Sequence, residues 1–210
     1  MLSSLKDLNK NKELNLIYKT FINDSQLPYI YSGSFVNPKK LPSKLKIFYD
    51  NILKIINERY DYVVIVNDEN YLYFVALLLD KYFLDSINNE TLPTKLLYID
   101  TPILLRDFKA QINNNVQLYS EEIKDNIYKL RYIIWDNLQD TKSEYDINKM
   151  QEILKIRYIN DYGNIFIINT NTKDNMSSIQ NIKKLLINYT IIDCTNQKIT
   201  LYTSDTKEGT

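Results

Sequence analysis

Four short apolar runs, each followed by an amphipathic stretch, constrain the fold of this chain more than any other feature. Strands that are apolar on both faces are typical of a parallel sheet covered by helices on both sides. The sequence therefore predicts an α/β fold. The strands are expected at YVVIV (62–66), KLLYID (95–100), RYIIWD (131–136) and NIFIIN (164–169). The intervening helices are expected over 72–87, 101–112, 119–130, 143–161 and 177–188.

The C-terminal part of the chain completes the sheet. YTIIDCTNQKITLY (189–202) predicts a fifth strand, a turn around Asn196 and Gln197, and a returning strand. Gly163 is expected to end the helix that precedes the fourth strand. The fold class is thus a parallel five-stranded sheet in a three-layer arrangement.

The segment before the first strand contains two further predicted helices, over residues 1–24 and 43–58, joined by a connector with three of the five prolines. We divide the chain into an N-terminal helix and connector (1–42), an α/β domain (43–202) and a flexible tail (203–210).

Composition excludes several classes of activity. The chain has 26 basic and 26 acidic residues, so it lacks the overall positive field that draws in nucleic acid. It has no histidine, which excludes Ser-His-Asp and Cys-His catalysis, and its single cysteine excludes a cysteine-and-histidine zinc site. Cys194 is expected to be a small buried residue within a strand. We expect no metal and no catalytic residue.

No feature of the sequence points to a membrane. The N-terminus lacks the apolar core of a signal peptide, and no apolar run approaches the roughly 20 residues that span a bilayer. The expected localisation is cytoplasmic.

In a parallel sheet, the carboxyl ends of the strands form the edge where ligands bind. The first strand here enters NDENYL (67–72) and then a helix, which is the arrangement of a phosphate-binding loop. Such a loop needs glycines to turn backbone N–H groups inward and a lysine to neutralise phosphate. This turn has neither, and Asp68 and Glu69 would repel phosphate. We therefore expect no functional phosphate loop and no bound cofactor.

Two other strand ends carry candidate site residues. The third strand ends in Asp136, at the position where many nucleotide hydrolases hold Mg²⁺, although a strand-end Asp often only caps a turn. Its neighbour Asn137 is an amide and cannot act as a general base. The fourth strand leads into Asn169 and Asn171. Either residue would orient a water molecule, contact a phosphate or simply form a turn.

The ordered set of these pieces resembles the AAA+ domain of the DnaC/DnaI-type bacterial helicase loaders, including the IstB-like ATPases. The resemblance covers residues 43–202. It is carried by LLYIDTPILLRDFKAQI, by YIIWDNLQDTKSEYDINKMQEILKIRYINDYGNIFIINTN, and by LLINYTIIDCTNQKITLY. It implies that Asp136 is the Walker B aspartate and Asn171 the sensor-1 asparagine. The family's Walker A residues, its arginine finger and sensor-2 arginines, and its zinc module have no counterpart here.

These departures favour a degenerate AAA+ fold kept as a scaffold. The resemblance implies a non-catalytic replication protein, a loader-like adaptor or inhibitor acting in primosome assembly. Its partner would be a replicative helicase, a helicase loader or an initiator. Two alternatives stay open: a divergent nucleotide-binding ATPase, and an inactive subunit of a clamp-loader or initiator-like assembly.

One basic cluster is a candidate for partner or DNA binding. It consists of Lys39, Lys40, Lys44 and Lys46. Phe48 and Tyr49 follow it, which fits single-stranded DNA, but a solvated helix start is the favoured explanation of the cluster. Residues 1–42 as a whole replace the family's helicase-contact module and are the expected partner-binding element.

Overall fold

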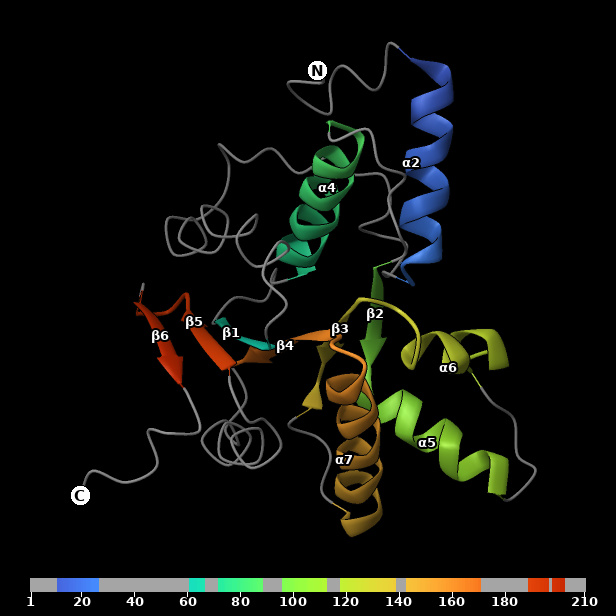
Figure 1. Cartoon of the computed structure of the whole chain (residues 1–210), viewed down its shortest axis with the longest axis vertical. Coiled ribbons are helices and arrows are strands. Elements are labelled where there is room, and N and C mark those ends of the chain that lie inside the picture. The colour runs from blue at the N-terminus through green and yellow to red at the C-terminus, as the bar shows by residue number, and fades with distance from the viewer. Residues whose placement is uncertain are drawn as a thin grey trace.

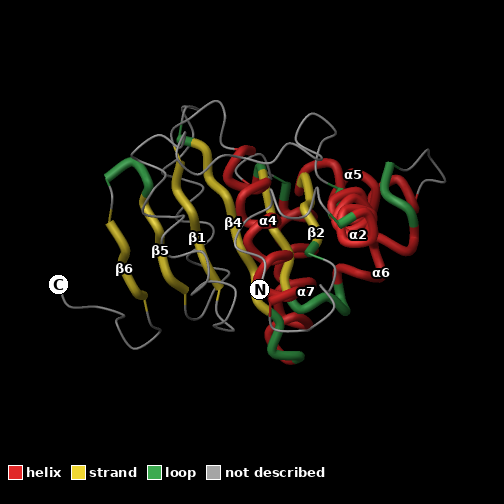
Figure 2. Tube along the Cα trace, turned by 90° about the horizontal axis from the view of Figure 1, so that it is seen from above, coloured by secondary structure: helices red, strands yellow, loops and turns green. Residues whose placement is uncertain are grey.

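The computed structural model describes residues 11–26, 61–66, 72–88, 96–112, 118–138, 143–170, 189–196 and 198–202. Within these ranges a single sheet runs through the molecule in the order β2-β3-β4-β1-β5-β6 (Figure 2). Its strands are β1 (Asp61–Val66), β2 (Leu97–Asp100), β3 (Tyr132–Asp136), β4 (Gly163–Asn169), β5 (Tyr189–Asp193) and β6 (Lys198–Tyr202).

The pairing confirms the predicted parallel sheet. Strands β1 to β5 are all parallel to one another, and β6 returns antiparallel to β5. The connection from β1 to β2 therefore crosses over two intervening strands, which requires the helix α4 (Leu72–Asn88) between them. The carboxyl ends of all five parallel strands therefore lie at one edge of the sheet.

Helices cover both faces of the sheet. Figure 1 shows α2 (Lys12–Asp24) and α4 on one side, and α5 (Thr101–Ile112) and α7 (Glu144–Ile159) on the other. The short helix α6 (Glu121–Ile127) packs with α5 and α7 in the same apolar cluster. The predicted helices at 43–58 and 177–188, the proline-containing connector and the tail lie outside the described residues.

Two separate apolar clusters form the core, one on each face. Because successive strand residues point to opposite faces, Val64 and Ile134 join the cluster under α2 and α4, whereas Val63 and Ile133 join the cluster under α5, α6 and α7. The strands are therefore buried on both faces, as the apolar runs predicted.

Helix α2 is part of this core. It begins at Lys12, where the side chain of Asn11 accepts hydrogen bonds from two backbone N–H groups of the first turn. Its residues Tyr18, Phe21 and Ile22 are buried in the cluster that also contains α4 and one face of the sheet. The first ten residues of the predicted helix, and the proposed boundary at residue 42, lie outside the described residues.

The expectation that Gly163 ends α7 is wrong. Asp161 takes the left-handed conformation there, with φ of 58°. The N–H of Tyr162 bonds to the carbonyl of Arg157 over 2.9 Å, and that of Asp161 to Tyr158 over 3.1 Å, which together form a Schellman motif. Gly163 instead opens β4, where an added Cβ would overlap the ring of Tyr132.

Cys194 is buried as expected, but it lies in the turn after β5 and not within the strand. Its N–H donates to the carbonyl of Ile65 over 2.9 Å, so the bonding between β1 and β5 continues one residue past the strand. Burial raises the pKa of the Cys194 thiol to about 12, which keeps it protonated.

Candidate functional site

The carboxyl ends of β2 and β3 bring two aspartates side by side. Asp100 and Asp136 are register partners, each the last residue of its strand. On the neighbouring pair of strands, Val66 of β1 faces Asn169 of β4. The structure therefore places the ends of β1, β2, β3 and β4 along one edge, as the sequence predicted for its candidate site.

Asp136 is fully buried, and both of its carboxylate oxygens accept hydrogen bonds from within the protein. The hydroxyl of Tyr98 donates to Oδ2 over 2.5 Å, and the backbone N–H of Asn137 donates to Oδ1 over 2.8 Å. Hydrogen bonds to an ionised acceptor contribute about 1.5–3 kcal/mol each. A metal ion at this carboxylate would have to compete with both donors.

Asn137 extends this arrangement to the neighbouring strand. Its φ of 55° lies in the left-handed region, which asparagine tolerates better than most residues. Its side-chain amide donates to Oδ2 of Asp100 over 3.0 Å, and Oδ1 of Asp100 accepts the N–H of Ile103 in the first turn of α5. Asn137 thus links the ends of β2 and β3 through a hydrogen bond.

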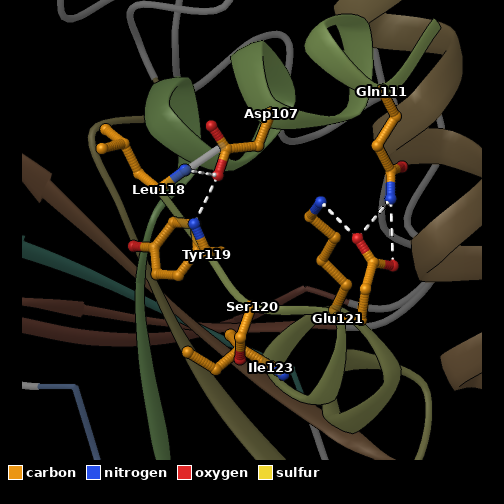
Figure 3. Close-up of polar contacts among 8 residues, drawn as sticks. Asp107, Gln111, Leu118, Tyr119, Ser120, Glu121 and Ile123 are labelled. Carbon is orange, nitrogen blue, oxygen red and sulfur yellow. Dashed lines mark hydrogen bonds and ion pairs between the residues drawn. The ribbon is translucent and has the colours of Figure 1, made fainter. Parts of the chain in front are cut away.

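Tyr119 and Asp107 continue the hydrogen bonding from Asp100, and Figure 3 shows the contacts of Asp107 with Leu118 and Tyr119. The N–H of Asp100 donates to the hydroxyl oxygen of Tyr119 over 3.1 Å. The Oδ2 atom of Asp107, from α5, accepts the backbone N–H groups of Leu118 and Tyr119 over 2.7 and 2.5 Å. These bonds fix the start of the segment leading to α6.

The electrostatics of the edge favour a protonated phenol at Tyr119. Burial is the main cause that raises the pKa of Tyr119 to about 12, and the charges of Asp100, Asp107 and Asp136 act in the same direction. Tyr119 therefore stays a neutral phenol at physiological pH. The described part of the chain contains no group of three or more Asp, Glu, Cys or His residues arranged to hold a metal ion.

The end of β4 is closed by a different contact. The N–H and the hydroxyl of Thr170 both donate to the carbonyl of Val66, over 2.7 and 3.0 Å. These two bonds join the residue that follows β4 to the end of β1. Asn171 follows directly but lies outside the described residues, so its role as a sensor-1 asparagine stays a prediction.

Other predicted site residues also fall outside the described ranges. They are the turn at 67–71 and the lysines Lys39, Lys40, Lys44 and Lys46. Conversely, the structure brings Tyr98, Tyr119 and Asp107 to the edge, which the sequence alone did not single out. Only the position of Tyr98, two residues before the end of a short strand, offered a sequence signal that it would face the same side as Asp100.

Comparison with known proteins tests the fold. No protein-family model matches the sequence, and no curated protein matches it. Among solved structures, the crystal structure of the DnaC helicase loader superposes with a TM-score of 0.54 at 12% identity, covering 79% of this chain and 99% of that one. The chain therefore shares its fold with that helicase loader structure.

Two other solved structures give weaker superpositions. The crystal structure of DnaI has a TM-score of 0.47 at 15% identity and covers 77% of this chain and 86% of that one. A DNA replication initiation factor has a TM-score of 0.49 at 10% identity, covering 76% of this chain and 50% of that one.

The Walker B role expected for Asp136 stays a prediction. None of the described helices is long and apolar enough to cross a membrane.

Proposed function

We propose that this chain is a non-catalytic interaction protein of DNA replication. It acts as a helicase-loader-like adaptor or inhibitor and binds a replicative helicase, a helicase loader or an initiator. The fold of the DnaC helicase loader supports the loader-like part of this proposal. The non-catalytic part, that the chain binds its partner without hydrolysing ATP, depends on the chemistry at the end of β3.

The observation that carries the proposal is the pairing of Asp136. Its oxygens accept from Tyr98 and from the Asn137 backbone, and Asn137 replaces an acid with an amide that bonds to Asp100. A Walker B site needs a carboxylate directed at hydrated Mg²⁺ and a base that positions water. Here the corresponding groups serve as structural hydrogen-bonding partners.

Nucleotide binding and hydrolysis test the non-catalytic part. The melting temperature is measured with and without millimolar ATP and Mg²⁺, and phosphate release is followed over hours. Ligand at 100-fold excess over its dissociation constant would stabilise the fold by about 2.7 kcal/mol. We expect an unchanged melting temperature and no phosphate release. Hydrolysis that is lost on Asp136→Asn would instead establish the divergent ATPase.

Partner binding tests the replication part. The proposed contact element is residues 1–42, of which α2 is described. Its inner face is buried, so a partner would meet its outer face, where Leu16 is 67% exposed. The tagged protein is used to capture host replication proteins, and each captured helicase, loader or initiator is then tested in purified form.

Matched variants make this capture specific. Leu16→Asp places a charge on the outer face of α2, and we expect it to weaken the captured interaction at least tenfold. Tyr158→Asp is the control, because Tyr158 is 60% exposed but lies on α7, a helix that packs on the opposite face of the sheet. Equal binding by both variants would reject α2 as the contact element. Absence of any replication protein from the capture would reject the proposed function.

A further inference from the structure

The last turn of α2 is bonded directly to the edge strand β2. Ser25 caps this helix and is fully buried, and its hydroxyl donates to the carbonyl of Ile22 over 2.6 Å. The backbone N–H of Tyr98 donates to the carbonyl of Ser25 over 2.7 Å. Since β2 pairs only with β3 within the described sheet, this N–H lies on the outer side of the strand. The position of α2 and the backbone of Tyr98 are therefore linked.

The side chain of the same tyrosine reaches the candidate site. Tyr98 is the register partner of Ile134, two residues before Asp136, and its hydroxyl donates to Oδ2 of Asp136 over 2.5 Å. One residue thus contacts α2 through its backbone and the Walker B position through its hydroxyl. Short hydrogen bonds depend steeply on distance and angle, so a small shift of this ring would lengthen the bond to Asp136.

Helix α2 packs against α4 through a small group of side-chain contacts. The rings of Tyr18 and Phe83 meet edge to face with centroids 5.1 Å apart, and Phe21 packs on Phe83 at 5.5 Å. The Tyr18 hydroxyl also donates to the buried carboxylate of Asp80. These rings lie in the cluster that also contains one face of the sheet, and substitutions in α2 weaken its contacts with α4 while every strand residue keeps its side chain.

We propose that Tyr98 couples the seating of α2 to the Asp136 carboxylate, so that a partner which lifts α2 changes the site at the end of β3. The coupling is reciprocal. If a partner of α2 changes the affinity of the Asp136 site for a ligand by some factor, that ligand changes the affinity for the partner by the same factor. Tyr98 acts here as a positioning residue. The coupling does not depend on which protein or ligand moves α2.

Carboxyl ¹³C NMR of the full chain tests this coupling. Aspartate side chains are labelled, and the Asp136 signal is assigned through Asp136→Asn. Tyr98→Phe removes only the hydroxyl and defines the signal of Asp136 without that bond. Phe21→Ala removes an α2 anchor, and Leu16→Ala on the exposed face of the same helix is the matched control. Amide hydrogen exchange of residues 12–24 reports whether α2 is released.

We expect Phe21→Ala to move the Asp136 signal toward its Tyr98→Phe position, and Leu16→Ala to leave it unchanged. In a Tyr98→Phe background, Phe21→Ala should cause no further shift. An unmoved Asp136 signal in a protein whose α2 amides have lost protection would overturn the coupling. So would an equal shift with and without the Tyr98 hydroxyl. If Phe21→Ala does not fold, Tyr18→Phe replaces it as the variant that releases α2. If the amides of α2 stay protected in each single variant, the variant with both Tyr18→Phe and Phe21→Ala is measured and judged by the same criteria.

Discussion

Arg157 of α7 donates from Nε to Oδ1 of Asn164 in β4 over 2.7 Å, and both side chains are buried. The remaining guanidinium nitrogens donate to the carbonyls of Ile127, Leu130 and Gly163. Asn164 also accepts from the Trp135 indole over 2.8 Å and donates from its side chain to Oδ1 of Asp61 over 2.8 Å. This network joins α6, α7 and β3 to the amino ends of β1 and β4.

We predict that Arg157→Lys destabilises the protein by about 3 kcal/mol. An ammonium group lacks the planar fork that reaches Asn164 and three carbonyls at once, and a buried charge that has lost its partners is costly. Urea denaturation measures the change. Lys155→Ala, on the exposed side of the same helix, should stay within about 0.5 kcal/mol of the wild type. A similar small effect for Arg157→Lys would show that the network contributes little.

Asp61 should make stability depend on pH. Burial raises its pKa from the ordinary 3.8 to about 6, against the opposing effects of its bonds from Asn164 and the charge of Arg157. A raised folded-state pKa means that the folded protein binds the proton more tightly. Its contribution to stability is therefore fully present below pH 4 and is lost as the pH rises through about 6.

The matched variant for this pH effect is Asp61→Asn, which keeps an oxygen acceptor for Asn164 and cannot titrate. Urea denaturation is measured from pH 4 to pH 7. We expect the free energy of unfolding of the wild type to fall, relative to that of the variant, by on the order of 2 kcal/mol over this range. Parallel curves for the two proteins would contradict the raised pKa.

Asp161 should respond to substitution through its backbone conformation. Its φ of 58° is accessible to glycine without strain, whereas alanine lacks the local hydrogen bonding that helps aspartate there. We predict that Asp161→Gly is more stable than Asp161→Ala by about 1 kcal/mol, as measured by thermal unfolding. Equal melting temperatures would argue against a strained left-handed residue at the end of α7.

Gly163 should respond through packing. A methyl group at this position overlaps the Tyr132 ring, so we predict that Gly163→Ala costs about 1–3 kcal/mol. The same substitution made in a Tyr132→Leu background should cost much less, because the overlapping ring is absent. A double-mutant cycle by urea denaturation gives the coupling between the two sites. Additive effects would place the cost elsewhere than this contact.

Some of the candidate site could be predicted from the sequence. The apolar run that ends in Asp136 fixed both the strand and the place of the carboxylate at its end, because strand periodicity is local. The helix predicted over 101–112 agrees with α5, whose second residue is proline. The end of α7 was mispredicted because Asp161, and not Gly163, takes the left-handed conformation that ends the helix.

The sequence by itself determined the α/β class, the positions of the five parallel strands and the aspartate at the end of β3. Only the tertiary structure decided which groups that aspartate forms hydrogen bonds with. Tyr98 lies 38 positions before Asp136, and Asp61 lies 103 positions before Asn164, yet each pair is hydrogen-bonded. Such contacts depend on strand order and register, which are set by how the whole sheet packs between its helices and not by any local pattern.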